Sequence, residues 1–154
     1  IVDAKYKSER LRVNPKKAKF DKAAKIRIAK ESKEAKKIYA KYTPTLYINE
    51  PFMMPLNSKI TSAFGNKRVF NGSLKSYHSG TDFRAKTGTP LVTANRGKVV
   101  LVKNRFFAGN SVIIDHGQGI YSGYYHMSKF AVKVGQMVEK GDLLGYAGAT
   151  GRVT

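Results

Sequence analysis

Two residues of types that bind metal ions stand four positions apart near the middle of the chain. His78 and Asp82 lie in the run Ser-Tyr-His-Ser-Gly-Thr-Asp-Phe, residues 76–83. An imidazole and a carboxylate are both zinc ligands, and a turn at Ser79-Gly80 would let the two converge on one Zn²⁺ ion. The simpler interpretation of this spacing is a surface His–Asp hydrogen bond. A catalytic zinc normally takes three protein ligands, and the chain has three histidines in total and no cysteine.

The other two histidines stand at the ends of apolar, strand-like segments. His116 follows a buried-looking run that ends at Asp115, and it precedes a glycine. We interpret His116 as a structural residue that caps the strand through a hydrogen bond. His126 follows two tyrosines, so the residues alone favour a half-buried strand position for it.

The elements that must position these residues change in character near Leu46. Glycines and short β-branched runs replace a lysine-rich segment there, and turn signals such as Asn71-Gly72 recur. The predicted strands are 60–64, 82–84, 90–94, 97–103, 111–115, 120–126, 131–133 and 142–147. This pattern predicts a mainly β domain, a two-sheet antiparallel sandwich or barrel-like fold over residues 46–154.

A long N-terminal helix precedes this domain. Apolar residues recur among the lysines of residues 16–42 at helical spacing, and Pro15 and Pro44 flank the run. We interpret residues 16–44 as a basic connecting helix with one face packed on its neighbours. Residues 11–14 alternate like the end of a strand, so residues 1–15 are interpreted as the remnant of an upstream region.

The net charge of +19 favours polyanionic partners such as nucleic acid, anionic lipid or cell-wall polymer. Residues 1–42 hold 15 of the 29 Lys and Arg residues, so the positive charge is spread over unlike segments. Aromatic and basic residues do not interleave as in a recognisable RNA-binding motif. The sequence therefore predicts no specific nucleic-acid partner. No apolar run is long enough to cross a bilayer.

A series of short motifs from about residue 52 onward resembles the lysostaphin/LytM-type zinc endopeptidases in order and spacing. The matching blocks are residues 60–65, 68, 78–82, 88–94, 97–99, 112–117, 124–128, 134–138, 141–145 and 148–151. Ordered agreement over such a length is far more specific than the His–Asp spacing alone. The helix at 16–42 also resembles the connecting helix of Gram-negative members.

The resemblance implies a peptidoglycan hydrolase that cuts peptide cross-links and binds stem peptides and glycan strands. By the same resemblance His78 and Asp82 are zinc ligands, and His126 lies beside the metal and assists catalysis. Tyr77 and Tyr125 are candidates for the substrate groove. Such an enzyme acts where the cell wall is, so it implies export to the periplasm or cell surface.

The sequence departs from the family pattern after residue 151. The family continues to a His-x-His motif that supplies the third zinc ligand, and no histidine follows His126 here. We therefore expect these residues to bind zinc weakly and to be inactive alone. An open sheet edge left by a missing strand would favour self-association. The alternatives are a non-catalytic module that binds the cell wall or activates a hydrolase, and a basic nucleic-acid-binding β domain.

Overall fold

The structure is a computed structural model that describes residues 6–11, 20–70 and 72–153. Within these residues, strands make up most of the regular structure, as the sequence predicts. The chain divides into two compact units. The first holds Ile1–Phe20, Ser58–Arg84 and Thr154, and the second holds Asp21–Asn57 and Ala85–Val153.

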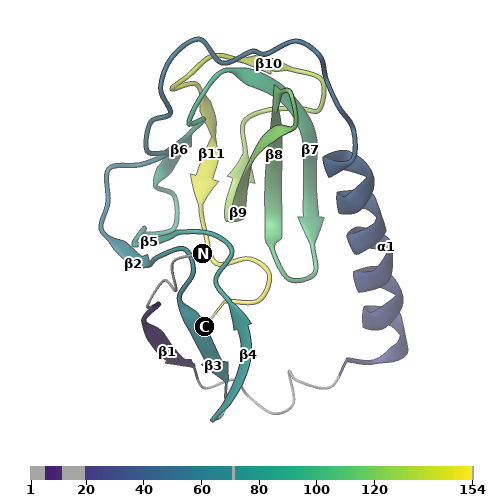
Figure 1. The fold of residues 1–154 in the computed structure, drawn as a ribbon, viewed down its shortest axis with the longest axis vertical. Helices are drawn as coiled ribbons and strands as arrows, with labels where there is room; N and C mark the ends of the chain where they lie inside the picture. The colour runs from purple at the N-terminus through teal and green to yellow at the C-terminus, as the bar shows by residue number, and fades with distance from the viewer. Residues whose placement is uncertain (1–5, 12–19, 71, 154) are drawn as a thin grey trace. The chain divides into compact units, whose positions relative to one another are not determined.

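The second unit is built on a six-stranded antiparallel sheet with the strand order β10-β7-β8-β9-β11-β6 (Figure 1). The strands are β6 (Pro90–Val92), β7 (Gly97–Arg105), β8 (Gly109–Gly117), β9 (Ile120–Phe130), β10 (Met137–Val138) and β11 (Leu143–Ala147). The three long strands β7, β8 and β9 follow one another in sequence and pair as hairpins. They form the centre of the unit because short connections favour pairing of sequential antiparallel strands.

The apolar core of this unit lies against β8. Val112 and Ile114 are fully buried there and pack with Val99, Met127 and Leu144 from neighbouring strands. Alternate residues of a strand face opposite sides of the sheet, so Ile113 belongs to the other face. Ile113 is also fully buried. Both faces of β8 are therefore covered.

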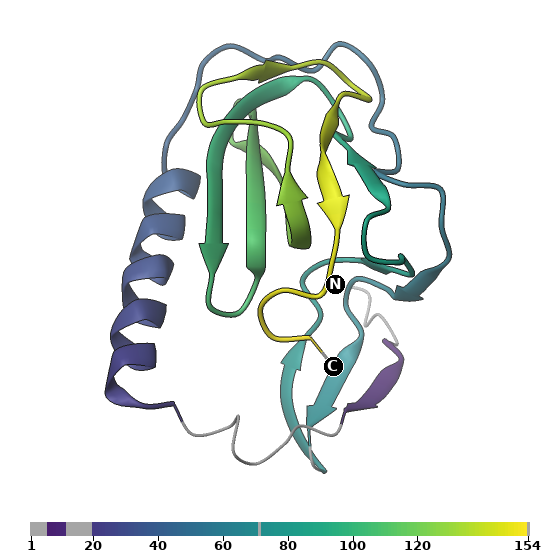
Figure 2. The same ribbon diagram turned by 180° about the vertical axis from the view of Figure 1, so that it is seen from behind.

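Helix α1 (Lys22–Tyr39) runs alongside the β7–β8 hairpin, as the views from the front and from behind both show (Figures 1 and 2). The helix begins after Asp21, whose carboxylate accepts a hydrogen bond of 2.7 Å from the backbone N–H of Ala24. This N-cap satisfies one of the first N–H groups of the helix. Beyond the helix, the Thr43 hydroxyl donates to Asp115 of β8 at 2.6 Å and ties the connection to the sheet.

The helix is shorter than the predicted span of 16–42. Residues 20–21 and 40–42 are not helical, and residues 16–19 lie outside the described part of the chain. The helix begins after Asp21 because the Asp21 carboxylate accepts from the N–H of Ala24, which would otherwise bond to a carbonyl of a preceding helical turn. At the other end, Thr43 bonds to the sheet and Pro44 has no N–H for a further helical bond.

Glu31 is the buried acidic residue of α1, with 7% of its surface exposed. One carboxylate oxygen accepts from Arg27 Nε at 2.7 Å, and the other accepts from the backbone N–H of Phe106 at 2.8 Å. Burial opposes ionisation, but these hydrogen bonds and the Arg27 charge outweigh it and hold the pKa of Glu31 below its ordinary value of 4.5. The carboxylate therefore joins the helix to the β7–β8 connection.

We expect Glu31→Gln to destabilise the protein by about 1–3 kcal/mol at neutral pH, because it removes the charge from two hydrogen bonds. The lowered pKa means that the stabilisation is present above pH 4.5 and is lost as the pH falls through the folded-state pKa. Urea unfolding of both proteins would therefore show a difference that shrinks toward pH 3. Glu34→Gln is the matched control, since Glu34 pairs with Lys103 at the surface. An equal loss in both variants would contradict the prediction.

The first unit contains two small sheets. One has the order β1-β3-β4 and the other pairs β2 with β5. Their strands are β1 (Ser8–Leu11), β2 (Ile60–Ser62), β3 (Lys67–Phe70), β4 (Ser73–Tyr77) and β5 (Asp82–Phe83). β1 pairs with β3 in parallel, whereas β3 and β4 form an antiparallel hairpin. The remnant strand predicted at 11–14 overlaps β1 at Leu11, and residues 12–14 lie outside the described residues.

Several strand predictions need correction. The strands of the described residues fall into three sheets, where the sequence predicted two. Residues 131–133 are not a strand, and β3, β4 and β10 were not predicted. The basic and serine-rich segments of β3 and β4 lack the apolar alternation on which strand prediction depends. Among the residues described, no helix has the length and apolar character needed to span a membrane.

Candidate functional site

His78 and Asp82 meet in the first unit, at the two ends of the loop between β4 and β5. His78 directly follows β4, Asp82 begins β5, and the chain bends at Gly80. His78 Nε2 lies 3.2 Å from Asp82 Oδ1. The four-residue spacing thus brings the imidazole and the carboxylate together through a turn, as the sequence predicts.

The His78 ring is held in one orientation by contacts at its other nitrogen. His78 Nδ1 lies 3.1 Å from the carbonyl oxygen of Ala63 and 3.0 Å from the Ser62 hydroxyl oxygen. A carbonyl only accepts, so Nδ1 carries a proton and donates it. If the imidazole is neutral, Nε2 then carries a lone pair, and this lone pair faces an oxygen of Asp82. Two acceptors at this distance require a shared cation, which is either a proton on the ring or a metal ion.

Arg68 of β3 holds the second oxygen of Asp82. Its Nη2 donates to Asp82 Oδ2 at 2.6 Å, while Oδ1 is left to face His78. The Asp82 side chain is 47% exposed, whereas His78 is buried. The pair is therefore open to solvent from the carboxylate side.

Glu9 of β1 contacts the residues that orient His78 and Asp82. Glu9 accepts hydrogen bonds from the Ser62 hydroxyl at 2.9 Å and from the Asn66 amide at 2.6 Å, and Arg68 Nε lies 4.0 Å away. Burial would raise the pKa of Glu9, but the Asn66 and Ser62 hydrogen bonds and the Arg68 charge hold it below its ordinary value. Because Ser62 donates to Glu9, its oxygen is free to accept from His78. Sequence reasoning missed Glu9 and Ser62, and no motif marks either residue.

An aromatic pocket of about 320 Å³ adjoins His78 within the first unit. Tyr6, Phe64 and Tyr77 line it together with His78. Tyr77 is 54% exposed, and its ring meets that of Tyr6 edge to face, with the ring centres 6.3 Å apart. Tyr77, a candidate for the substrate groove, thus lies beside the candidate metal ligand.

His126 belongs to the second unit, where β9 bulges against β8. Its backbone φ of 58° is in the left-handed region, which costs a non-glycine residue about 1–3 kcal/mol. The backbone N–H donates to the carbonyl of Ala108 at 2.8 Å, and ring Nδ1 donates to the carbonyl of Thr150 at 2.7 Å. His126 is half-buried, and within residues 6–11, 20–70 and 72–153 its other ring nitrogen, Nε2, has no hydrogen-bond partner.

Tyr125 and His116 occupy contrasting environments in the same unit. Tyr125 is 42% exposed, and its hydroxyl lies 3.4 Å from that of Tyr39. Desolvation, with the Tyr39 contact, raises the pKa of Tyr125. His116 is fully buried, and its ring nitrogens each lie 2.7 Å from a partner, the carbonyl of Arg96 and the hydroxyl of Ser122. Burial lowers the pKa of His116, although the Arg96 hydrogen bond and Asp115 oppose the shift.

The donor set at His78 and Asp82 suits zinc, since neutral imidazole and carboxylate are both common zinc ligands. The Nδ1–H contacts also match the usual way in which a metal-binding histidine is oriented. Within residues 6–11, 20–70 and 72–153, no group of three or more His, Cys, Asp or Glu side chains gathers around one point. His78 and Asp82 are thus two candidate ligands for a zinc ion.

The model of Peptidase family M23 matches residues 76–154, which is more than half of the chain. The matched segment includes His78, Asp82 and His126. The chain therefore belongs to peptidase family M23. This confirms the resemblance to lysostaphin-type enzymes that the order of short motifs predicts.

Relatives of this family are similar over the same part of the chain. The peptidoglycan DD-endopeptidase ShyA of Vibrio cholerae is 43% identical over 103 residues, which are 65% of this chain and 24% of that protein. Lysostaphin of Staphylococcus simulans is 35% identical over 79 residues, or 50% of this chain and 16% of lysostaphin. The chain spans about a quarter of the length of ShyA.

Solved structures of the family share the fold. An M23 peptidase structure from Pseudomonas aeruginosa superposes with a TM-score of 0.73 and 39% identity over 84% of this chain and 52% of that one. A zinc-containing peptidase from Vibrio cholerae superposes with a TM-score of 0.64 and 37% identity, over 68% of this chain and 34% of that one. The mainly β fold is therefore that of known M23 peptidases.

Proposed function

We propose that this chain contributes to a zinc-dependent endopeptidase that hydrolyses the peptide cross-links of bacterial peptidoglycan. The observation that carries the proposal is His78 Nε2 facing Asp82 Oδ1 at 3.2 Å, with Nδ1 already engaged by the carbonyl of Ala63. Family membership supports a peptidase, and ShyA is named a peptidoglycan DD-endopeptidase. The zinc content of the Vibrio cholerae neighbour supports the choice of metal.

In this proposal His78 and Asp82 hold the zinc ion. A zinc ion held there would lower the pKa of a bound water molecule and would polarise the carbonyl of the scissile peptide bond. Arg68 keeps Asp82 oriented through the 2.6 Å bond to Oδ2, so that Oδ1 stays directed at the shared position. Ser62 and Ala63 fix the proton on Nδ1 of His78, which leaves Nε2 as the ligand atom.

His126 is proposed as the residue that assists proton transfer or steadies the developing oxyanion. With Nδ1 donating to the carbonyl of Thr150, Nε2 is the ring atom that would accept or donate a proton. The cost of the left-handed backbone at His126 fits a residue whose orientation serves a function. Tyr77 and Tyr125 are proposed to line the substrate groove, and His116 is proposed as purely structural.

The domain assignment is also proposed. Residues 46–154 would form the peptidase domain, residues 16–44 the connecting helix, and residues 1–15 the end of an upstream region. We propose export to the periplasm or cell wall.

Because the chain offers only three histidines and His116 is buried between two hydrogen-bond partners, we expect residues 1–154 alone to bind zinc weakly and to be inactive. Self-association through an open sheet edge would appear as a dimer in sedimentation.

The proposal is tested with purified, cross-linked muropeptides and the complete protein that carries these residues. We expect new stem-peptide ends in mass spectra, loss of hydrolysis after chelation, and recovery with zinc. Binding of muropeptides without any hydrolysis at any metal concentration would favour the non-catalytic wall-binding module. Recovery with magnesium but not with zinc would contradict the assigned ligand chemistry.

We expect Ser62→Ala to weaken zinc binding by about 10–100-fold, the usual range for losing a hydrogen bond that orients a ligand. The substitution removes the hydroxyl between Glu9 and His78 and leaves the ligands in place. Competition for zinc between the protein and a coloured chelator measures the affinity. Nitrogen-15 NMR of the His78 ring reports its tautomer and does not depend on enzymatic activity. Ser128→Ala, at an exposed serine of β9, is the control and should change neither. Unchanged affinity in Ser62→Ala would rule out a positioning role.

A further inference from the structure

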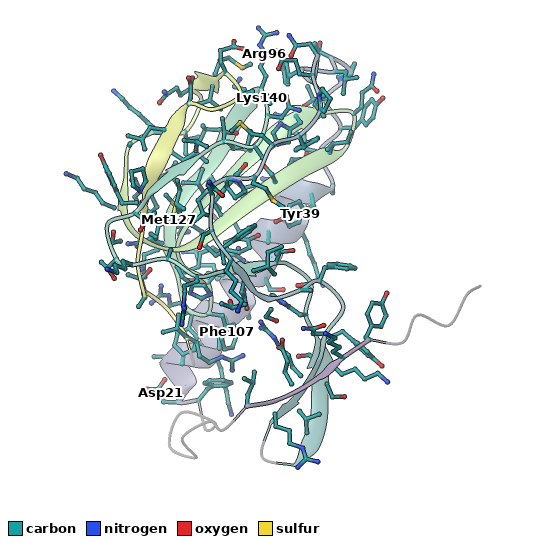
Figure 3. All side chains as sticks on the ribbon, turned by 90° about the vertical axis from the view of Figure 1, so that its left-hand side faces the viewer. Asp21, Tyr39, Arg96, Phe107, Met127 and Lys140 are labelled. Atoms are coloured by element: carbon teal, nitrogen blue, oxygen red, sulfur yellow. The ribbon has the colours of Figure 1, made fainter. Side chains whose placement is uncertain are left out.

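A pocket of about 420 Å³ lies between α1 and the β7–β8 connection, entirely within the second unit. Ile28, Ser32 and Ala35 line it from the helix, and Phe107 and Ala108 line it from the hairpin. In Figure 3, Phe107 lies between Asp21 and Tyr39 along the length of the helix. The volume falls within the range of small-molecule sites.

The hollow arises because small residues stand on the helix face between two of the contacts that the helix makes with the sheet. Near one end of the hollow, Glu31 bonds to the backbone of Phe106. Near the other, the Tyr39 ring meets Tyr121 edge to face, with the ring centres 5.3 Å apart. Ser32 and Ala35 lie on the same helix face between these points and cannot fill the space.

The pocket carries an excess of positive charge. Lys36 and Arg105 both line it, and among the described residues neither side chain has an ion pair or a hydrogen bond. Glu31 is the acidic residue of the wall, and Arg27 pairs with it at 2.7 Å. Lys36 and Arg105, whose charge also acts on Glu31, therefore give the wall an excess of positive charge beside its apolar surface.

We propose that this pocket binds a short peptide through its free carboxylate, with a small apolar side chain against the walls. Lys36 and Arg105 would pair with the carboxylate, and the guanidinium offers a two-pronged contact that a carboxylate matches. Ala35, Ala108 and the Phe107 ring would contact an alanine-sized side chain. The site lies outside His78 and Asp82, so it does not depend on zinc or on the proposed hydrolysis.

A peptide carboxylate fits these walls better than a free phosphate does. Phosphate is strongly hydrated and gains nothing from apolar contacts, whereas four of the nine lining residues are apolar, namely Ile28, Ala35, Phe107 and Ala108. A carboxylate with an adjoining methyl group uses both the cations and the apolar surface.

The experiment titrates the nitrogen-15-labelled chain, without added metal, with N-acetyl-D-alanyl-D-alanine, with its C-terminal amide and with inorganic phosphate. We expect saturable shifts confined to residues 28–39 and 105–108, with a Kd of about 1 mM for the carboxylate. The amide and phosphate should bind at least about fivefold more weakly, which corresponds to the loss of one modest charged contact. Equal binding of the amide, or tighter binding of phosphate, would overturn the proposal.

Substitutions separate the pocket from its surroundings. Lys36→Gln and Arg105→Gln should each weaken carboxylate binding by about fivefold, and Ala35→Leu should abolish it by filling the space. Lys37→Gln, at the exposed neighbouring position that does not line the pocket, is the matched control and should bind normally. Lys36 is exposed, so its substitution tests the site even if a change at Arg105 in β7 unfolds the chain. Unchanged binding in both Lys36→Gln and Ala35→Leu would locate the ligand elsewhere.

Discussion

On the proposed function, we expect Asp82→Asn to lower peptidoglycan hydrolysis by about a hundredfold or more in an active enzyme that contains these residues. The amide has nearly the shape of the carboxylate but no charge, so it is a poor zinc ligand. The substitution also removes the anionic partner of Arg68, which lies 2.6 Å from Asp82 Oδ2. Metal affinity and hydrolysis rate should therefore fall together, as measured by chelator competition and by muropeptide release.

A second acidic residue provides the comparison for this result. Glu139 pairs with Arg96 at the surface with its side chain 64% exposed, and Glu139→Gln should leave both metal binding and hydrolysis unchanged. If Asp82→Asn retained full metal affinity while His78→Ala lost it, the carboxylate would be an orienting partner and not a ligand. If neither substitution changed metal affinity, the assigned zinc site would be wrong.

The largest effect on stability is expected for Ile114→Ala. Ile114 is fully buried at the centre of β8 and packs in the main apolar core. Removal of its side chain leaves a cavity in a well-packed interior, and such changes cost about 2–5 kcal/mol. We expect the urea midpoint to fall in proportion and the melting temperature to drop by roughly 4–20 °C.

Ile120 is the matched control because it is the same residue type on β9 and is 42% exposed. Ile120→Ala should change the free energy of unfolding by about 0.5 kcal/mol or less. A similar loss in both variants would mean that Ile114 is not part of a tightly packed core. A changed urea m-value in Ile114→Ala would point to partial unfolding of the native state instead of a simple cavity.

The His78–Asp82 contact could be predicted from the sequence because it is local. Four residues and a glycine turn limit how far the two side chains can separate. The support from Glu9 could not be predicted, since its hydrogen bond with Ser62 joins residues 53 positions apart. That contact depends on β1 pairing in parallel with β3, and no local pattern marks such a pairing.

The helix shows the same division between local and distant causes. Its amphipathic lysine-rich pattern predicts a helix, but the pattern continues through Tyr42 whereas the helix ends at Tyr39. The end is decided by the chain beyond it, where Thr43 bonds to Asp115 on β8. Side-chain periodicity carries no information about such a tether.

The sequence by itself determined the mainly β class, the helix ahead of the sheet, and the meeting of His78 with Asp82. These features follow from apolar periodicity, from glycine turns and from short separations along the chain. All three are local, so they do not depend on where the segment lies in the folded protein. Only the tertiary structure decided the ring tautomer of His78, the backbone strain at His126 and the cationic pocket beside α1. Each of these arises from groups that are distant along the chain, and folding alone brings such groups within hydrogen-bonding or packing distance.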